Sequence, residues 1–236
     1  MARMAVLVDL SFFLKRYARI KRKCLKDAFD AKDTALAIWN AAIDHARKNR
    51  DEIYRILVYD CSPLSKRAHN PVTGRSIDFS STPEHNFRSA LHKELTCLRK
   101  VALRLGELAD RRRWIIRPHA MKQLLDGSLR LDQLQEKDVI YDIEQKGVDI
   151  KIGIDIASIA YKKLAERIVL VSGDSDFVPA AKLARREGLD FILDPLWAPI
   201  TASLNEHIDG LDSSWPRPGM PSEIEEPIAS SPFDAE

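Results

Sequence analysis

The sequence predicts an α/β protein of three layers, with a central, mainly parallel sheet of five strands and helices on both faces. Short apolar runs that end on acidic or small residues alternate along the chain with segments in which apolar residues recur at helical spacing. Uninterrupted apolar runs are typical of strands buried on both faces of a parallel sheet. With 236 residues, the chain is long enough for one substantial domain of this architecture.

The individual elements follow from these patterns in chain order. The apolar runs predict strands at residues 4–9, 53–59, 114–116, 168–172 and 189–193. Helical spacing predicts helices that begin near residues 12 and 149, and others over 32–48, 84–104, 119–126, 131–137, 176–187 and 200–208. Gly188 is a normal C-terminal signal for the helix 176–187. Residues 61–82 are predicted to form a long polar loop, and loops of that length in compact domains are more often functional than idle.

Composition divides the chain into a folded domain, residues 1–211, and a tail, residues 212–236. The tail is rich in Pro and Ser, poor in apolar residues, and carries six acidic residues against one arginine. We therefore expect the tail to be disordered. Because the whole chain has a formal charge of +2, the rest carries about +7, and a basic domain suits an anionic polymer as its partner.

Several classes of protein are poorly supported. The cysteines, Cys24, Cys61 and Cys97, lack the spacing of zinc ligands or of a disulfide framework, so we expect a reducing cytoplasm. No apolar run is long enough to cross a bilayer, so no membrane partner is expected. The nine glycines form neither a dinucleotide-binding fingerprint nor a P-loop. A phosphatase with an Asp-x-Asp nucleophile is disfavoured because position 11 is Ser11.

Acidic residues gather where the predicted strands end. Asp9 ends the first strand, and Asp149 stands at the start of a helix. Asp174 and Asp176 follow the strand 168–172. The carboxyl ends of parallel strands share one edge of the sheet, where open α/β proteins bind ligands. Carboxylates that converge there repel one another unless a cation holds them, and Mg²⁺ or Mn²⁺ binds such oxygen ligands and activates water. The pattern therefore predicts metal-dependent phosphate chemistry, most simply phosphodiester hydrolysis.

Each of these acidic residues also has a purely structural interpretation. A single Asp after a strand is more often a turn or helix-capping residue than a ligand, and Asp176 would cap the helix that follows it. The combination of the four positions is what favours a metal site. Asp155 lies six residues after Asp149, which places it on a different helix face. It is either a further ligand or supporting group of the metal site, or a partner for Lys151.

Three segments of the chain resemble one known family. AVLVDLSFF (5–13), KGVDIKIGIDIAS (146–158) and IVLVSGDSDFVPAAKLARREG (168–188) are similar, in order and spacing, to the NYN domain, a branch of the PIN-like nucleases that includes LabA-like proteins. The resemblance runs from residue 4 to about residue 210. It implies a PIN-like fold and a metal-dependent endoribonuclease that uses Mg²⁺ or Mn²⁺. The residues that match its acidic catalytic and metal-binding core are Asp9, Asp149, Asp174 and, as a fourth member, Asp176, with Asp155 at a further acidic position.

The first segment departs from the family pattern, which commonly reads Asp-x-x-Asn, because Phe12 occupies the position of the amide. In the family that amide lies near the metal or the substrate. Ser11, Ser172 and Ser175 are the nearby hydroxyl groups available to donate a hydrogen bond in its place. The departure leaves open a second function, a catalytically weak or inactive RNA-binding regulatory protein that keeps the acidic site.

Cations near the predicted site are candidates for binding RNA, the expected partner, through its phosphates. The candidates are Lys15, Arg16, Arg67, Arg75 and Lys146. Lys15 and Arg16 belong to seven cations within residues 15–26, for which a solvated helix face is an equally good explanation. The loop 61–82 should emerge at the edge that carries Asp9, whereas Arg111–Arg113 should lie toward the opposite edge. Whether the chain forms a homodimer is left open.

Overall fold

The computed structural model describes residues 1–24 and 30–215, without the side chains of residues 22–24. The predicted disordered tail therefore lies, after its first four residues, outside the described residues. The side chains of three of the seven cations within residues 15–26 lie outside them as well.

A seven-stranded sheet runs through the molecule in the order β6-β5-β2-β1-β7-β8-β9. Its strands are β1 (Arg3–Asp9), β2 (Glu52–Cys61), β5 (Val101–Ile116), β6 (Val139–Lys146), β7 (Arg167–Val171), β8 (Asp190–Asp194) and β9 (Gly210–Leu211). Every neighbouring pair is parallel except β5 and β6, which are antiparallel. The mainly parallel sheet is confirmed, and the predicted number of five strands is too low.

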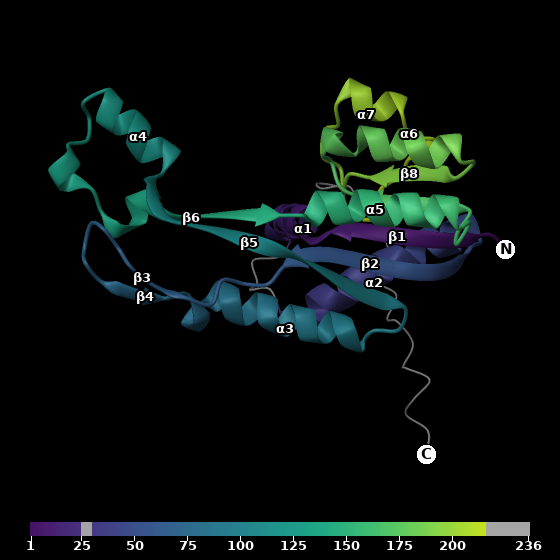
Figure 1. Cartoon of the computed structure of the whole chain (residues 1–236), viewed down its shortest axis with the longest axis horizontal. Helices are drawn as coiled ribbons and strands as arrows, with labels where there is room; N and C mark the ends of the chain where they lie inside the picture. Colours follow the sequence, from purple (N-terminus) through teal and green to yellow (C-terminus); the bar gives the residue numbers. More distant parts are fainter. Residues whose placement is uncertain (25–29, 216–236) are drawn as a thin grey trace, which may run out of the picture.

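Helices cover both faces of this sheet, as predicted (Figure 1). One face carries α1 (Leu10–Cys24), α2 (Ala31–Asn49) and α3 (Pro83–Cys97), and the other carries α5 (Val148–Tyr161) and α6 (Val178–Arg186), with the short α7 (Ala202–Glu206) beside them. Alternate side chains of a strand point to opposite faces. In β1, Val6 and Val8 therefore join the core under α1 and α2, whereas Ala5 and Leu7 join the core under α5. None of the described helices is both long and apolar enough to cross a bilayer.

β5 begins inside the segment that was predicted to be the end of a helix. α3 stops at Cys97, and Lys100 adopts a left-handed backbone conformation, with φ 65°, that turns the chain into β5. The predicted strand 114–116 is therefore only the far end of a 16-residue strand. Local periodicity extends the helix too far because apolar residues continue at helical spacing through Leu91, Leu95, Leu98, Ala102 and Leu105.

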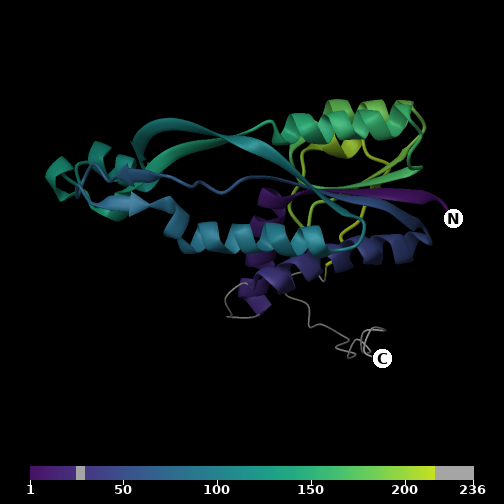
Figure 2. The ribbon, with the colours of Figure 1, turned by 60° about the horizontal axis from the view of Figure 1, so that its bottom comes forward.

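β5 and β6 continue past the carboxyl edge of the parallel strands as an antiparallel hairpin. This hairpin supports a lobe, which we define as the outer halves of β5 and β6 together with β3 (Arg67–His69), β4 (Ser76–Asp78), α4 (Pro118–Leu125) and the 3₁₀ helices Phe79–Ser81, Leu131–Gln133 and Glu136–Asp138. Figure 2 shows the lobe at one end of an elongated molecule. The segment 61–82, predicted to be a loop, thus contains the β3–β4 hairpin and the first of these 3₁₀ helices.

Candidate functional site

Three predicted acidic residues lie at the carboxyl edge of the sheet. Asp9 is the last residue of β1, and strand alternation directs it toward the face that α5 covers. Asp149 lies in the first turn of α5. Asp174 follows β7, the strand that pairs with β1. The parallel pairing of β1 with β7 therefore brings together residues that are 165 positions apart in the sequence.

A close contact between β5 and β6 sets the position of α5. A Cβ atom on Gly106 would lie only 2.6 Å from the carbonyl oxygen of Lys146, so this position of β5 requires glycine. Gly106 also pairs with Cys61 of β2. The end of β6 is thereby held against the central sheet, and Asp149 follows three residues later.

Hydrogen bonds to the backbone orient two of the carboxylates. Oδ1 of Asp9 accepts a hydrogen bond from the backbone N–H of Phe12 at 3.0 Å. Oδ1 of Asp174 accepts one from the backbone N–H of Asp176, also at 3.0 Å, and so caps the 3₁₀ helix Ser175–Phe177. Asp174 is therefore the capping residue of this turn, whereas the sequence interpretation gave that role to Asp176. Each bond occupies one carboxylate oxygen and leaves the other directed elsewhere.

The carboxylates influence one another electrostatically. Burial raises the pKa of Asp9 above its ordinary value; the N–H of Phe12 opposes this shift, and the charge of Asp149 adds to it. Burial also raises the pKa of Asp149, and the charges of Asp174 and Asp176 raise it further. Asp149 is thus linked electrostatically to each of the other three predicted residues, Asp9, Asp174 and Asp176. Within residues 1–24 and 30–215, however, no three acidic, His or Cys side chains already stand as close together as metal ligands do.

Phe12, at the position where the sequence resemblance predicts an amide, covers the turn after β7. A Cβ atom on Gly173 would lie 2.9 Å from Cε2 of Phe12, so the ring lies directly against the backbone of the turn. Phe12 still contributes its backbone N–H to Asp9. Phe12 therefore orients Asp9 through its backbone and presents an apolar wall at this position.

The three predicted serines have different environments. Ser172 is fully buried, and its Oγ accepts a hydrogen bond from the backbone N–H of Asp174 at 3.3 Å. It therefore stabilises the turn and cannot reach a substrate, which corrects its predicted role. Ser175 is exposed. Ser11 donates a hydrogen bond to Oε1 of Gln145 at 3.1 Å.

Lys15 and Arg16 line a cavity of about 820 Å³ close to Asp9, together with Phe12, Arg19 and the segment 198–199 after β8. The guanidinium of Arg16 donates to the carbonyl oxygen of Leu196 at 3.0 Å, which fixes it against this segment. Burial, followed by the charge of Arg19, lowers the pKa of Arg16. This part of the predicted cation cluster is thus a wall beside the carboxylates.

Other predicted cations lie elsewhere. Arg67 and Arg75 lie on the lobe, where they face Asp78 at 3.0 Å and Glu136 at 3.9 Å. They do not form a wall beside Asp9, because the segment 61–82 folds into the β3–β4 hairpin. Arg111–Arg113 lie in an irregular part of β5 on the lobe, beyond the carboxyl edge and not at the opposite one. Lys146 is the last residue of β6 and is exposed. It lies three residues before Asp149 in the sequence, so its position is consistent with the predicted contact to a phosphate.

Asp155 lies apart from the other acidic residues. Its Oδ2 accepts a hydrogen bond from the hydroxyl of Tyr59 at 2.8 Å and pairs with Nε of Arg104 at 3.3 Å. Burial and the charge of Asp155 raise the pKa of Tyr59. Among the described residues Asp155 thus pairs with Arg104 and not with Lys151.

Sequence reasoning overlooked Asp60, a further acidic residue at the carboxyl edge. Asp60 is fully buried on the α3 side of β2, where it accepts two hydrogen bonds from Arg88, at 2.7 and 2.9 Å, and contacts Nε2 of His92 at 2.8 Å. Burial alone would raise its pKa, but the hydrogen bond to His92 and the charge of Arg88 lower it below the ordinary value. The signal was present, because Asp60 ends an apolar run as Asp9 does.

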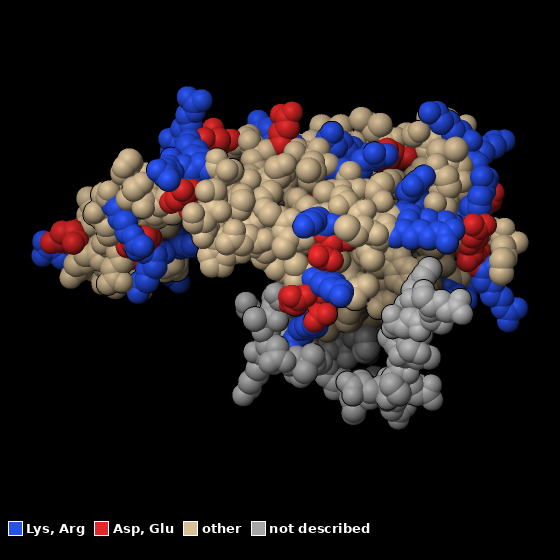
Figure 3. All heavy atoms as spheres, turned by 90° about the horizontal axis from the view of Figure 1, so that it is seen from below, with Lys and Arg blue, Asp and Glu red and all other residues tan. Residues whose placement is uncertain are grey.

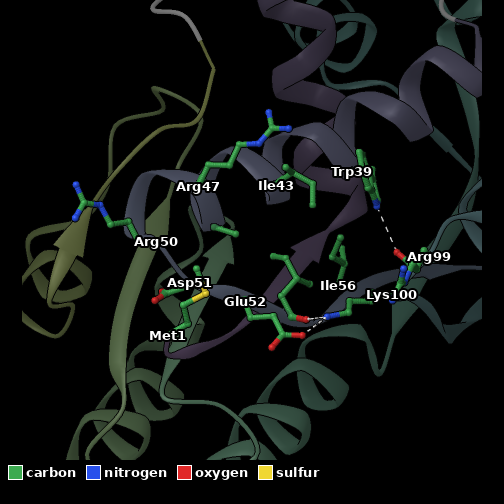
Figure 4. Close-up of a pocket in the computed structure, with 12 residues that line it drawn as sticks. Met1, Trp39, Ile43, Arg47, Arg50, Asp51, Glu52, Ile56, Arg99 and Lys100 are labelled. Atoms are coloured by element: carbon green, nitrogen blue, oxygen red, sulfur yellow. Dashed lines mark hydrogen bonds and ion pairs between the residues drawn. The ribbon is translucent and has the colours of Figure 1, made fainter. Parts of the chain in front are cut away.

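A cavity of about 600 Å³ at the opposite edge of the sheet belongs to a separate region (Figure 4). Trp39, Ile43 and Ile56 form its apolar part, and Arg47 and Arg50 lie at its rim. Lys100 there pairs with Glu52 at 3.0 Å. On the face formed by α2 and α3, acidic and uncharged side chains separate the basic ones (Figure 3). Neither region adds a group to the carboxylate site.

Comparisons with known proteins agree with the resemblance seen in the sequence. No protein of curated function matches the chain. A solved structure of a protein of unknown function from Vibrio parahaemolyticus is similar, with 16% identity over 90% of this chain and 92% of that chain and a TM-score of 0.41. Residues 86–200 match the NYN domain, a segment that includes Asp149, Asp174 and Asp176 and begins after Asp9. Over residues 86–200 the chain is thus similar to the NYN domain, which belongs to the PIN-like nuclease superfamily.

Proposed function

We propose that this protein is a metal-dependent ribonuclease that hydrolyses RNA phosphodiester bonds at the carboxyl edge of its sheet. The observation that carries the proposal is the position of Asp9, Asp149 and Asp174 at the carboxyl edge of the sheet, where the charge of Asp149 acts on Asp9 and that of Asp174 acts on Asp149. The charge of Asp176 also acts on Asp149. Repulsion between these carboxylates lowers the stability of the fold. A bound cation would relieve the repulsion, so the cluster of acidic residues favours a cation as its ligand.

The residues present fit a hard divalent cation. PIN-like nuclease domains usually use divalent metals, and an all-carboxylate donor set suits Mg²⁺ or Mn²⁺. Asp9 and Asp174 each have one oxygen engaged by the backbone, which holds the carboxylate in a defined orientation. Asp149, Asp174 and Asp176 are exposed, so their side chains have room to change rotamer. These four residues are the ones that would hold the cation.

The remaining chemistry falls to residues around the carboxylates. When bound, the cation supplies an activated water and neutralises charge on the phosphoryl oxygens. Lys15, Arg16 and Arg19 lie where they can bind phosphates on one side of the scissile bond. Lys146 is an exposed cation at the entry to α5 and can bind a phosphate above Asp149.

A second function, RNA binding without efficient cleavage, is favoured by one observation. The ring of Phe12 lies against Gly173, where the family commonly has an amide near the metal or substrate. This alternative keeps the same residues and the same ligand and differs only in turnover. Cleavage and binding must therefore be measured separately.

Cleavage of labelled single-stranded and structured RNA by the full chain, with Mn²⁺ or Mg²⁺, tests the proposal. We expect Asp174→Asn to lower the cleavage rate at least about 100-fold, since it removes a ligand charge. The amide oxygen of Asn can still accept the hydrogen bond from Asp176, so the turn is kept. EDTA should abolish cleavage by the unmodified protein.

Asp132→Asn is the matched control, because Asp132 is an exposed acidic residue on the lobe. This variant should cleave at the unmodified rate. Equal cleavage by the Asp174→Asn variant and the unmodified protein would contradict the proposed site. Tight RNA binding without cleavage under either metal would establish the binding function instead.

A further inference from the structure

A second groove, of about 560 Å³, opens between the β5–β6 hairpin and the start of α3. Volumes of this size accommodate small ligands. Its apolar wall includes Phe79, Leu108, Tyr141 and Ile143, and its polar residues include His85 and Arg117. The two kinds of residue together indicate a ligand that has both a flat apolar part and a negative charge.

The aromatic part of the groove is rigid. The ring centroids of Phe79 and Tyr141 are 5.3 Å apart, and Trp114 packs against Tyr141 at the same centroid distance. The hydroxyl of Tyr141 donates to Oδ1 of Asp110 at 2.7 Å, which fixes the orientation of the ring. Ile143 remains 42% exposed. Tyr141 is itself buried and holds Phe79 in place, so the accessible surface is the ring of Phe79 beside Ile143. A fixed aromatic ring beside exposed apolar surface is a platform for an unpaired nucleobase.

The polar part of the groove has unmet hydrogen-bonding capacity. Nε of Arg117 and Nδ1 of His85 are buried without a hydrogen-bond partner among the described residues. Arg117 also forms no ion pair within residues 1–24 and 30–215, whereas Arg88, which lines the same groove, is paired with both Asp60 and Glu84. A buried donor without a partner costs free energy. An anionic group in the groove would satisfy Arg117.

One hydrogen bond links the groove to the segment that follows Asp9. Gln145 lines the groove and accepts the hydrogen bond from Ser11, which lies two residues after Asp9. The cavity of Lys15 and Arg16 is lined partly by the segment after β8, while this groove is lined by β5 and β6. Because β1 lies between β8 and β5 in the sheet, the two cavities flank Asp9 on opposite sides.

We propose that this groove binds one nucleotide of a single-stranded RNA next to the phosphate at the carboxylate site. The base lies against Phe79 and Ile143, and a phosphate of the same nucleotide faces Arg117 and His85. The RNA strand then crosses Asp9 from this groove to the cavity of Lys15 and Arg16. The choice of RNA as the ligand rests on the proposed function, whereas the groove's affinity for a nucleotide is tested separately.

Binding of a fluorescent single-stranded RNA of about ten nucleotides to the full chain, in EDTA, measures the groove without cleavage. We expect Ile143→Asn and Arg117→Gln each to weaken binding about five- to tenfold or more, because stacking and phosphate contacts are lost. Ile115→Asn is the control for the first variant, since Ile115 is also 42% exposed on the hairpin but lines a different cavity. Arg113→Gln is the control for the second, because Arg113 is exposed and paired with Asp142. Both controls should bind within twofold of the unmodified protein.

Competition identifies the chemistry of the ligand. A nucleoside monophosphate should displace the RNA from the unmodified protein at concentrations where inorganic phosphate does not. Unchanged binding by both Ile143→Asn and Arg117→Gln would overturn the inference, as would displacement by an apolar peptide and not by the nucleotide. Weaker binding by these variants in a protein that never cleaves RNA would refute the proposed nuclease and leave the groove assignment intact.

Discussion

Asp9 and Asp60 end neighbouring strands but have opposite electrostatic environments. Asp9 pairs in register with Tyr59, the residue before Asp60. Because side chains alternate along a strand, Asp9 and Asp60 therefore point to opposite faces of the sheet. Asp60 meets Arg88 and His92, and its pKa is lowered. The pKa of Asp9 is raised because the side chain is buried and lies near the negative charge of Asp149. Strand alternation thus separates an acidic residue whose charge the fold pairs internally from one whose pKa stays raised.

The largest expected effect is on stability at Asp60. Asp60→Ala should lower the free energy of unfolding by about 3–5 kcal/mol, because it leaves the largely buried Arg88 without its main partner. Chemical denaturation monitored by circular dichroism measures this loss. The double variant Asp60→Ala with Arg88→Met should recover part of it. A loss below about 1 kcal/mol would mean that the pair on this face contributes little.

Phe12 should show a smaller change, with opposite effects on stability and activity. Phe12→Asn removes the ring from Gly173 and should cost about 1–2 kcal/mol of stability, less than a fully buried Phe would. The cleavage rate should rise if the family's amide assists turnover. Ser11→Asn, one position away, is the control for adding an amide near Asp9. A rate that falls in Phe12→Asn would show that the ring itself supports the substrate.

Added metal should distinguish the two acidic residues directly. At about ten times its dissociation constant, Mn²⁺ should stabilise the unmodified protein by about 1.4 kcal/mol, because it binds only the folded state. Asp9→Asn should remove this response. Asp60→Asn should still be stabilised by Mn²⁺, even though this variant is expected to be less stable than the unmodified protein. Melting curves at several Mn²⁺ concentrations test both expectations, and a full response in Asp9→Asn would exclude Asp9 as a ligand.

The smallest effect is the pH dependence of stability without metal. The raised pKa of Asp9 means that its charge destabilises the fold at neutral pH, so Asp9→Asn should gain roughly 0.2–1 kcal/mol there. This gain should vanish as the pH falls through the pKa of folded Asp9, because the native acid is then protonated. Asp60, with its lowered pKa, behaves oppositely: its stabilisation is present above its ordinary value near 3.8 and is lost as the pH falls further. Denaturation of both Asn variants between pH 7 and 3 measures the two trends.

The parallel core and the acidic site could be predicted because their signals are local. An apolar run followed by Asp is visible in a few residues, and such strands must lie side by side to be buried. The lobe could not be predicted in this way. β6 alternates polar and apolar residues over a half-exposed hairpin, and the start of β5 continues the helical spacing of α3. The positions of Arg67 and Arg75 were predicted wrongly for the same reason. The pairing of β3 with β4 folds their segment into a hairpin, and no local pattern shows this pairing.

Residue type and local spacing predict the strand–helix order of the core and the similarity to the NYN domain, and they single out the four acidic residues as candidates. The pairing of Asp60 depends on the tertiary structure, because Arg88 and His92 reach it from a helix more than twenty residues away. The tertiary structure also decided that Ser172 is buried and that Arg117 faces a groove beside the site. Burial and charge pairing depend on contacts between distant segments, and no local pattern encodes them.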